Sequence, residues 1–186
     1  SHFQAPGGHI DKEDFEDAVS NMQGDSNQGP AILMQACKIG AARELFEETG
    51  QILGHKEPWT SEVPEDWKDF AASGHTPSAA GLQFVFRALT PPGRTRRFDA
   101  RFFLVDADEL TTDPDDFSAA SDELSHLQWV ALDDARSFDM PFITEVVLSE
   151  IQARAADRNP PESVPFFKNN NEESLFLRLR GHLPTD

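Results

Sequence analysis

Cysteine is nearly absent from this chain, since Cys37 is the one thiol among 186 residues. A single thiol cannot form a disulfide within the chain and suits a reducing compartment, so we expect a cytoplasmic protein. We expect Cys37 to pack rather than react, because no catalytic partner for it is visible in the sequence. Long apolar runs are also missing. No stretch of about 18 apolar residues predicts a membrane-spanning helix, and the start does not resemble a signal peptide.

Basic residues are scarce as well. The chain has 16 Lys and Arg against 33 Asp and Glu, a formal net charge of −17. This balance argues against binding to nucleic acid or to an anionic membrane, because both attract positive surfaces. The six histidines show neither HxxxH nor HxH spacing, so zinc is not predicted. The length favours a single domain over residues 1–186.

Acidic residues gather in one segment, which ends at Gly50 and reads Arg-Glu-Leu-Phe-Glu-Glu-Thr-Gly. The pattern over residues 37–53 predicts a helix. On that helix Glu44, Glu47 and Glu48 fall at i, i+3 and i+4 and share one face. Gly50 is a candidate for the left-handed residue that follows a helix end.

This acidic face has two interpretations. By itself it is most often a solvated helix surface. Three carboxylates at neighbour distance can also hold a divalent cation, whose charge offsets their repulsion. The opposite side carries apolar residues that can enter a core, namely Ile39, Ala42 and Phe46.

The segment resembles the heart of the Nudix box, whose pattern runs Gly, five residues, Glu, seven residues, then Arg-Glu-apolar-any-Glu-Glu-any-Gly-apolar. The matching residues are Arg43, Glu44, Leu45, Glu47, Glu48 and Gly50. Upstream, Pro6-Gly7-Gly8 followed by Ile10-Asp11 resembles the turn that opens the box.

The chain also departs from the family pattern. Gln35 stands at the position of the first Glu, so one carboxylate is absent. Residues 12–29 are rich in loop formers and form an insertion that splits the box. Gly29 fits the family's Gly by spacing, but Gly8 has the better local context. Gln51 replaces an apolar residue, and too few residues precede the opening turn for the strand that the family has there.

A second pattern narrows the resemblance. Thr90-Pro91-Pro92 is followed by Arg97-Phe98-Asp99-Ala100-Arg101-Phe102-Phe103. This resembles the Nudix branch that contains the coenzyme A diphosphatases of animal peroxisomes and mitochondria, together with bacterial relatives, in which Thr replaces Ala100.

The resemblance implies an α/β fold, a Nudix-type α/β/α sandwich with a mixed sheet. It implies a bound Mg²⁺ or Mn²⁺, held by the carboxylates of Glu44, Glu47 and Glu48 and by the carbonyl of Gly8, since these cations prefer oxygen ligands. Arg43 is expected to pair with Glu47 at i+4 and to be structural.

The activity implied is cleavage of a pyrophosphate linkage by metal-activated water, with the three glutamates as catalytic residues. Glu123 is our loop candidate for the general base, and an ordinary exposed acid is an equal interpretation of it. Arg97 and Arg101 lie at i and i+4 of an expected strand, where they either bind substrate phosphates or cap a surface strand. Because the chain is anionic, metal and local arginines would have to invert the potential at such a site.

The branch implies coenzyme A or acyl-CoA as substrate, cleaved to 3′,5′-ADP and phosphopantetheine. ADP-ribose or NADH is the alternative substrate class, and a Nudix-like nucleotide-binding module without turnover is an alternative of another kind. The expected partner is a small-molecule nucleotide, and the sequence leaves a homodimer open.

The remaining patterns predict further elements. Strands are expected at residues 81–89, 98–105 and 128–130, and a helix at residues 141–155. A helix or two is expected around residues 65–72, and a long loop at residues 106–122. Residues 158–186 are expected to be irregular apart from a short edge strand at residues 174–179.

Overall fold

The structure is a computed structural model that describes residues 29–90, 98–121, 127–169, 174–180 and 183–185. The chain divides into two compact units. Of the described residues, the helical unit contains 29–82, 105–121 and 127–129, and the sheet unit contains 83–90, 98–104, 130–169, 174–180 and 183–185. The expectation of a single domain over residues 1–186 stays a prediction.

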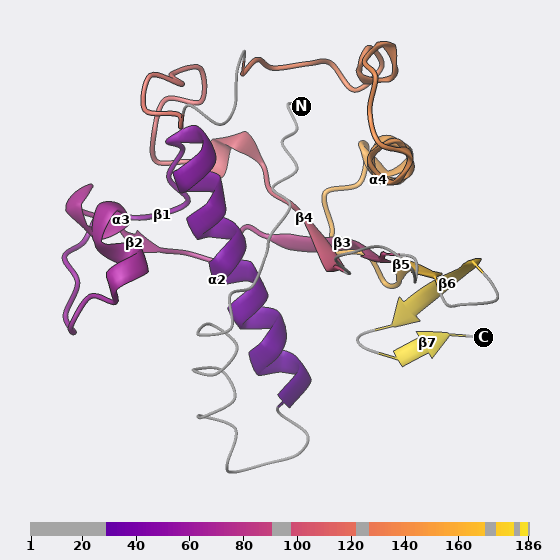
Figure 1. The fold of residues 1–186 in the computed structure, drawn as a ribbon, viewed down its shortest axis with the longest axis horizontal. Helices are drawn as coiled ribbons and strands as arrows, with labels where there is room; N and C mark the ends of the chain where they lie inside the picture. Colours follow the sequence, from indigo (N-terminus) through magenta and orange to yellow (C-terminus); the bar gives the residue numbers. More distant parts are fainter. Residues whose placement is uncertain (1–28, 91–97, 122–126, 170–173, 181–182, 186) are drawn as a thin grey trace. The chain divides into compact units, whose positions relative to one another are not determined.

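The helical unit is built around one long helix (Figure 1). Its elements are α2 (Gly29–Thr49), β1 (Gly54–His55), η1 (Glu65–Trp67), α3 (Lys68–Ala72), β2 (Thr76–Pro77) and η2 (Ala107–Glu109). Strands β1 and β2 pair in antiparallel register. The helical segment expected around residues 65–72 is confirmed, and so is the long loop for residues 106–121, where η2 is one short turn.

Helix α2 differs from the predicted helix at both ends. It begins at Gly29 rather than at residue 37, because residues 31–36 are strong helix formers and Pro30 is tolerated in a first turn. It ends at Thr49 rather than at residue 53. Gly50 adopts a φ of 74°, and its N–H still donates to the carbonyl of Phe46 at 2.8 Å. The prediction of a left-handed Gly50 is therefore confirmed.

An aromatic cluster forms the core beneath α2. Ile52, Trp67 and Phe70 are buried, and Ile39 and Phe46 of α2 pack against them. The rings of Phe46 and Phe70 meet edge to face with centroids 5.1 Å apart, a favoured aromatic geometry. The predicted apolar side of the helix thus faces the core.

The sheet unit contains a mixed sheet and one longer helix. Its elements are β3 (Gln83–Leu89), β4 (Asp99–Leu104), η3 (Ala135–Ser137), α4 (Phe142–Arg154), β5 (Val164–Asn169), β6 (Ser174–Arg180) and β7 (Leu183–Thr185). The strand order is β4-β3-β5-β6-β7. Strands β3 and β5 run parallel and the other neighbours antiparallel. The described chain is therefore a mixed α/β protein, and the predicted strands 81–89 and 98–105 and helix 141–155 are confirmed with shorter ends.

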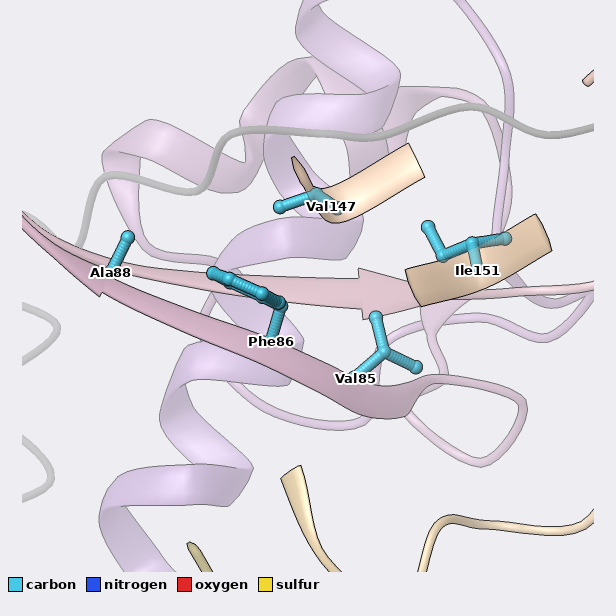
Figure 2. Packing of buried hydrophobic residues seen from close by; sticks show 5 residues of the cluster. All are labelled: Val85, Phe86, Ala88, Val147 and Ile151. Carbon is cyan, nitrogen blue, oxygen red and sulfur yellow. The ribbon is translucent and has the colours of Figure 1, made fainter. Parts of the chain in front are cut away.

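One face of this sheet is covered by α4. Val147 and Ile151 of the helix lie against Val85, Phe86 and Ala88 of β3 (Figure 2). Partly buried residues extend this cluster, including Ile143 and Val146 of the same helix. Ile143, Val146, Val147 and Ile151 thus form an apolar stripe along α4 that packs on the sheet.

Two sequence expectations are wrong. Residues 128–130 form no strand; the Trp129 indole instead donates to the carbonyl of Pro114 at 3.0 Å. Residues 158–186, expected to be irregular apart from an edge strand at residues 174–179, also contain β5 and β7; the expected strand is present as β6, but it lies between β5 and β7 rather than at an edge.

Strand β5 is not expected from the sequence, and it contains a proline. Pro165 argues against a central strand, because it cannot donate to a ladder. In the structure only Phe166 and Phe167 are in register with β3, opposite Arg87 and Ala88. Pro165 lies before that register, so its missing N–H breaks no bond to β3.

Within the described residues, no helix is both long and apolar enough to cross a membrane.

Replacing Gly50 by alanine tests the helix stop. The left-handed conformation disfavours any side chain by roughly 1–2 kcal/mol, and a Cβ at Gly50 would lie 2.7 Å from Cβ of Ala119. Gly74→Ala is the matched control, because Gly74 has a φ of 80° but a Cβ there meets nothing within 4 Å. Urea denaturation should show a clearly larger loss of unfolding free energy for Gly50→Ala. Equal losses would mean that the contact with Ala119 does not matter.

Candidate functional site

The three glutamates of the Nudix-like segment lie in the last two turns of α2. The helix is continuous through Glu44, Glu47 and Glu48, so their spacing places them on one side of it. Glu44 and Glu48 are half-buried and Glu47 is exposed. Oε2 of Glu44 is shielded from solvent. The carboxylates therefore range from a shielded to an open environment along one helical face.

Arg43 is held by two carboxylates. Its side chain is only 6% exposed, and its Nη1 lies 3.7 Å from Oε1 of Glu47 and 3.7 Å from Oδ2 of Asp66 in η1. The predicted pairing of Arg43 with Glu47 is confirmed. A nearly buried guanidinium needs such partners, and this one joins α2 to η1, so its role in this arrangement is structural.

The structure describes only some of the residues predicted to hold a metal or to act beside it. Gly8 and Glu123 lie outside the described residues. Among the residues that the structure describes, no three His, Cys, Asp or Glu side chains are grouped so that they could hold a metal ion. Glu44, Glu47 and Glu48 are among the described residues, so the structure does not bring their three carboxylates together as a group that could hold an ion, although carboxylate oxygens are the donor type that Mg²⁺ and Mn²⁺ prefer.

The loop that follows residue 110 is anchored at the C-terminal end of α2. The N–H of Ser121 donates to the carbonyl of Glu48 at 3.2 Å, and the N–H of Thr111 donates to the carbonyl of Ile52 at 2.9 Å. Ala119 packs where a side chain at Gly50 would otherwise lie. The predicted base, Glu123, follows this anchored segment by two residues in the sequence.

The side chain of Gln51 adds three hydrogen bonds to this loop. It is completely buried, and its Nε2 donates to the carbonyls of Asp113 at 3.0 Å and Asp116 at 2.8 Å. Its Oε1 accepts from the hydroxyl of Thr112. A buried amide with its donors and acceptor satisfied rigidifies its surroundings. The departure of Gln51 from the apolar family pattern therefore has a structural reason, which sequence reasoning missed.

The sheet unit brings together a different set of charges. Arg101 on β4, predicted to bind phosphate, lies directly opposite Arg87 on β3. Arg87 donates through Nε and Nη2 to the two carboxylate oxygens of Asp99, both at 2.7 Å, and Nη2 of Arg101 lies 3.3 Å from Oδ2 of Asp99. Arg97, the other predicted phosphate ligand, lies outside the described residues. Arg87 was missed, although a charged residue within the expected strand at residues 81–89 was a signal.

Asp99 is electrostatically perturbed by this arrangement. Burial by itself raises the pKa of its carboxyl, but the hydrogen bond from Arg87 and the charges of Arg101 and Arg87 outweigh burial, so the pKa is lowered overall. Asp99 is therefore the ionised centre of this group of side chains.

Cys37 is buried in α2, in keeping with a packing role.

No protein-family model, no curated protein and no solved structure matches this chain.

Gln51→Leu tests the anchored loop. Leucine has a similar size but leaves the carbonyls of Asp113 and Asp116 without their donor, so we expect a loss of about 2 kcal/mol in unfolding free energy. Gln83→Leu is the control, because the amide of Gln83 makes one exposed hydrogen bond, to the carbonyl of Arg158, and its loss should cost less than about 1 kcal/mol. Urea denaturation measures both, and a smaller loss for Gln51→Leu would contradict the assigned role.

Asp99 predicts a pH dependence of stability. Its pKa is lowered in the folded state, so its contribution is fully present above the unfolded pKa, about 3.9, and disappears as the pH falls through the folded pKa. The difference in unfolding free energy between the wild-type protein and Asp99→Asn should be constant near neutral pH and shrink below about pH 4. Urea titrations at a series of pH values measure it, and a difference that does not change with pH would argue against an ionised, paired Asp99.

Proposed function

We propose that this chain is a metal-dependent hydrolase of the Nudix type, which cleaves a pyrophosphate linkage in a nucleoside diphosphate derivative. The observation that carries the proposal is the segment from Arg43 to Gly50. It forms the end of a long helix with three carboxylates on one side, a buried arginine paired with one of them, and a left-handed glycine as its stop. The proposal extends to the fold, as a Nudix-type α/β/α sandwich, and to one domain over residues 1–186.

The proposed cofactor is Mg²⁺ or Mn²⁺. Glu44, Glu47 and Glu48, with the carbonyl of Gly8, would hold it, because hard cations take oxygen donors. When bound, such an ion supplies an activated water and neutralises charge that develops on the phosphoryl oxygens.

The chain's own residues position these groups. The ion pair with Arg43 restrains Glu47, and the contact of Ser121 with the Glu48 carbonyl fixes the loop beside the helix end. Glu123 is the proposed general base. Arg97 and Arg101 are the proposed ligands of the substrate phosphates, because arginine matches phosphate oxygens with several donors.

The substrate that the resemblance favours is coenzyme A or acyl-CoA, and ADP-ribose or NADH is the alternative. A nucleotide-binding module without turnover is a second candidate function. Gln35, an exposed residue of α2, stands where the family has a carboxylate, and this departure favours that candidate.

Glu48→Gln separates these functions. It removes a proposed metal ligand with little change in size, so turnover should fall by more than about 100-fold, the upper range for loss of a mere supporting group. Glu145→Gln, which alters an exposed glutamate of α4, should leave turnover unchanged. Ligand binding that survives Glu48→Gln, from a wild-type protein without turnover, would favour the binding module.

The substrate is identified by turnover with Mg²⁺ or Mn²⁺ on coenzyme A, acyl-CoA, ADP-ribose, NADH and a dinucleoside polyphosphate, with the products resolved by mass. Release of 3′,5′-ADP from coenzyme A alone would support the branch resemblance. Preference for another compound would keep the hydrolase and discard coenzyme A. Absence of turnover on every compound, from protein that binds the metal, would contradict the proposed activity.

A further inference from the structure

Three charged side chains on strands β3 and β4 form a cluster that the proposed chemistry does not fully use. We call Arg87, Asp99 and Arg101 the arginine cluster. Arg87 and Arg101 are register partners in the antiparallel pair, so their Cα atoms lie about 4.5–5.5 Å apart and their side chains leave the same face. Asp99 binds both guanidinium groups. Two like charges are thus held side by side by one carboxylate.

The charges in the arginine cluster do not balance. Two guanidinium groups face one ionised carboxylate, whose lowered pKa keeps it charged. The side chains of Arg87 and Arg101 are only 24% and 15% exposed, and charge shielded to that degree is normally compensated. Within the part of the chain that the structure describes, these three side chains therefore carry one positive charge in excess in a half-buried place, although the whole chain carries −17.

Donors of both arginines stay available for a further acceptor. Arg87 uses Nε and Nη2 for Asp99, and Arg101 uses Nη1 and Nη2. Among the described residues, Nη1 of Arg87 and Nε of Arg101 have no hydrogen-bond acceptor, and neither atom is fully shielded from solvent. An incoming anion could therefore bind without first displacing Asp99.

The guanidinium group of Arg87 also stacks on an aromatic ring. Its Cζ lies 4.6 Å from the ring centroid of Phe166 on β5, and that ring is buried. Stacking on a fixed ring orients the planar donors before a ligand arrives. A preorganised donor group loses less conformational freedom on binding than a mobile surface arginine.

We propose that the arginine cluster is an anion-binding site that takes a phosphate group, with Arg87 and Arg101 as ligands and Asp99 as an internal anion that limits the affinity. Phosphate matches the site, because its tetrahedral oxygens can accept from two guanidinium groups at once. The inference adds Arg87 to the expected role of Arg101. It rests on the proposed function only for the identity of the compound that carries the phosphate.

Direct titration of the protein with inorganic phosphate tests this site. Calorimetry gives the affinity, and the Nε–H nuclear magnetic resonance signals of the arginines report which side chains respond. Ionic strength is kept constant with sodium chloride, and a chelator excludes metal-mediated binding. Arg87→Gln should weaken binding by about tenfold, the effect of losing one charge-assisted hydrogen bond.

Two further variants have different expected effects on phosphate binding. Asp99→Asn keeps both arginines and removes the competing carboxylate, so it should tighten phosphate binding by about fivefold. Arg178→Gln is the matched control, because Arg178 lies in the same sheet but pairs with Glu150 near the surface, and it should leave the affinity unchanged. Equal weakening by Arg87→Gln and Arg178→Gln, or weaker binding in Asp99→Asn, would overturn the proposal.

The outcome is separable from that of the proposed hydrolysis. Phosphate binding with the expected signs, in a protein that turns over no pyrophosphate compound, would support the arginine cluster and contradict the hydrolase. Turnover that depends on Glu48, with phosphate affinity unaffected by Arg87→Gln, would do the reverse.

Discussion

The left-handed turn at Gly50 is the constraint on which the helical unit depends. It stops α2 directly after the carboxylates and sends the chain into the core through Gln51, Ile52 and Leu53, all buried. If the helix continued, the Glu48 carbonyl would accept from within the helix instead of from Ser121. The same turn leaves room for Ala119 to pack against the backbone. The shape of the candidate site therefore follows from one backbone conformation that glycine adopts easily.

The buried side-chain amide of Gln51, next to this turn, fixes the loop that follows residue 110. The hydrogen bonds of Gln51 reach Thr112, Asp113 and Asp116, so an acidic stretch that would otherwise be solvated is tied to the helix end. Polar groups buried in this way are costly unless all are satisfied. The network therefore favours one arrangement of the loop over others, which is the property that a proposed general base after it would need.

Electrostatics organises the sheet unit differently. The pairing of β3 with β4 places Arg87 opposite Arg101, and Asp99 forms an ion pair with each of them. In a chain with an excess of acidic residues, such a local positive surplus is the condition under which an anionic substrate could be attracted.

Local patterns in the sequence determined the elements whose causes are local. The spacing of Glu44, Glu47 and Glu48, the pairing of Arg43 with Glu47 and the stop at Gly50 all depend on residues within about one helical turn of each other. The apolar stripe of α4 follows in the same way from the helical period. The tertiary structure alone decided what joins distant residues. Pro165 lies in a strand because β3 pairs only beyond it, and β6 is internal because β7 covers its other edge. Gln51 replaces an apolar residue because loop carbonyls some sixty positions away accept its protons. The sequence specifies which chemical groups a side chain carries. Which distant strand or loop contacts that side chain is decided only by the fold.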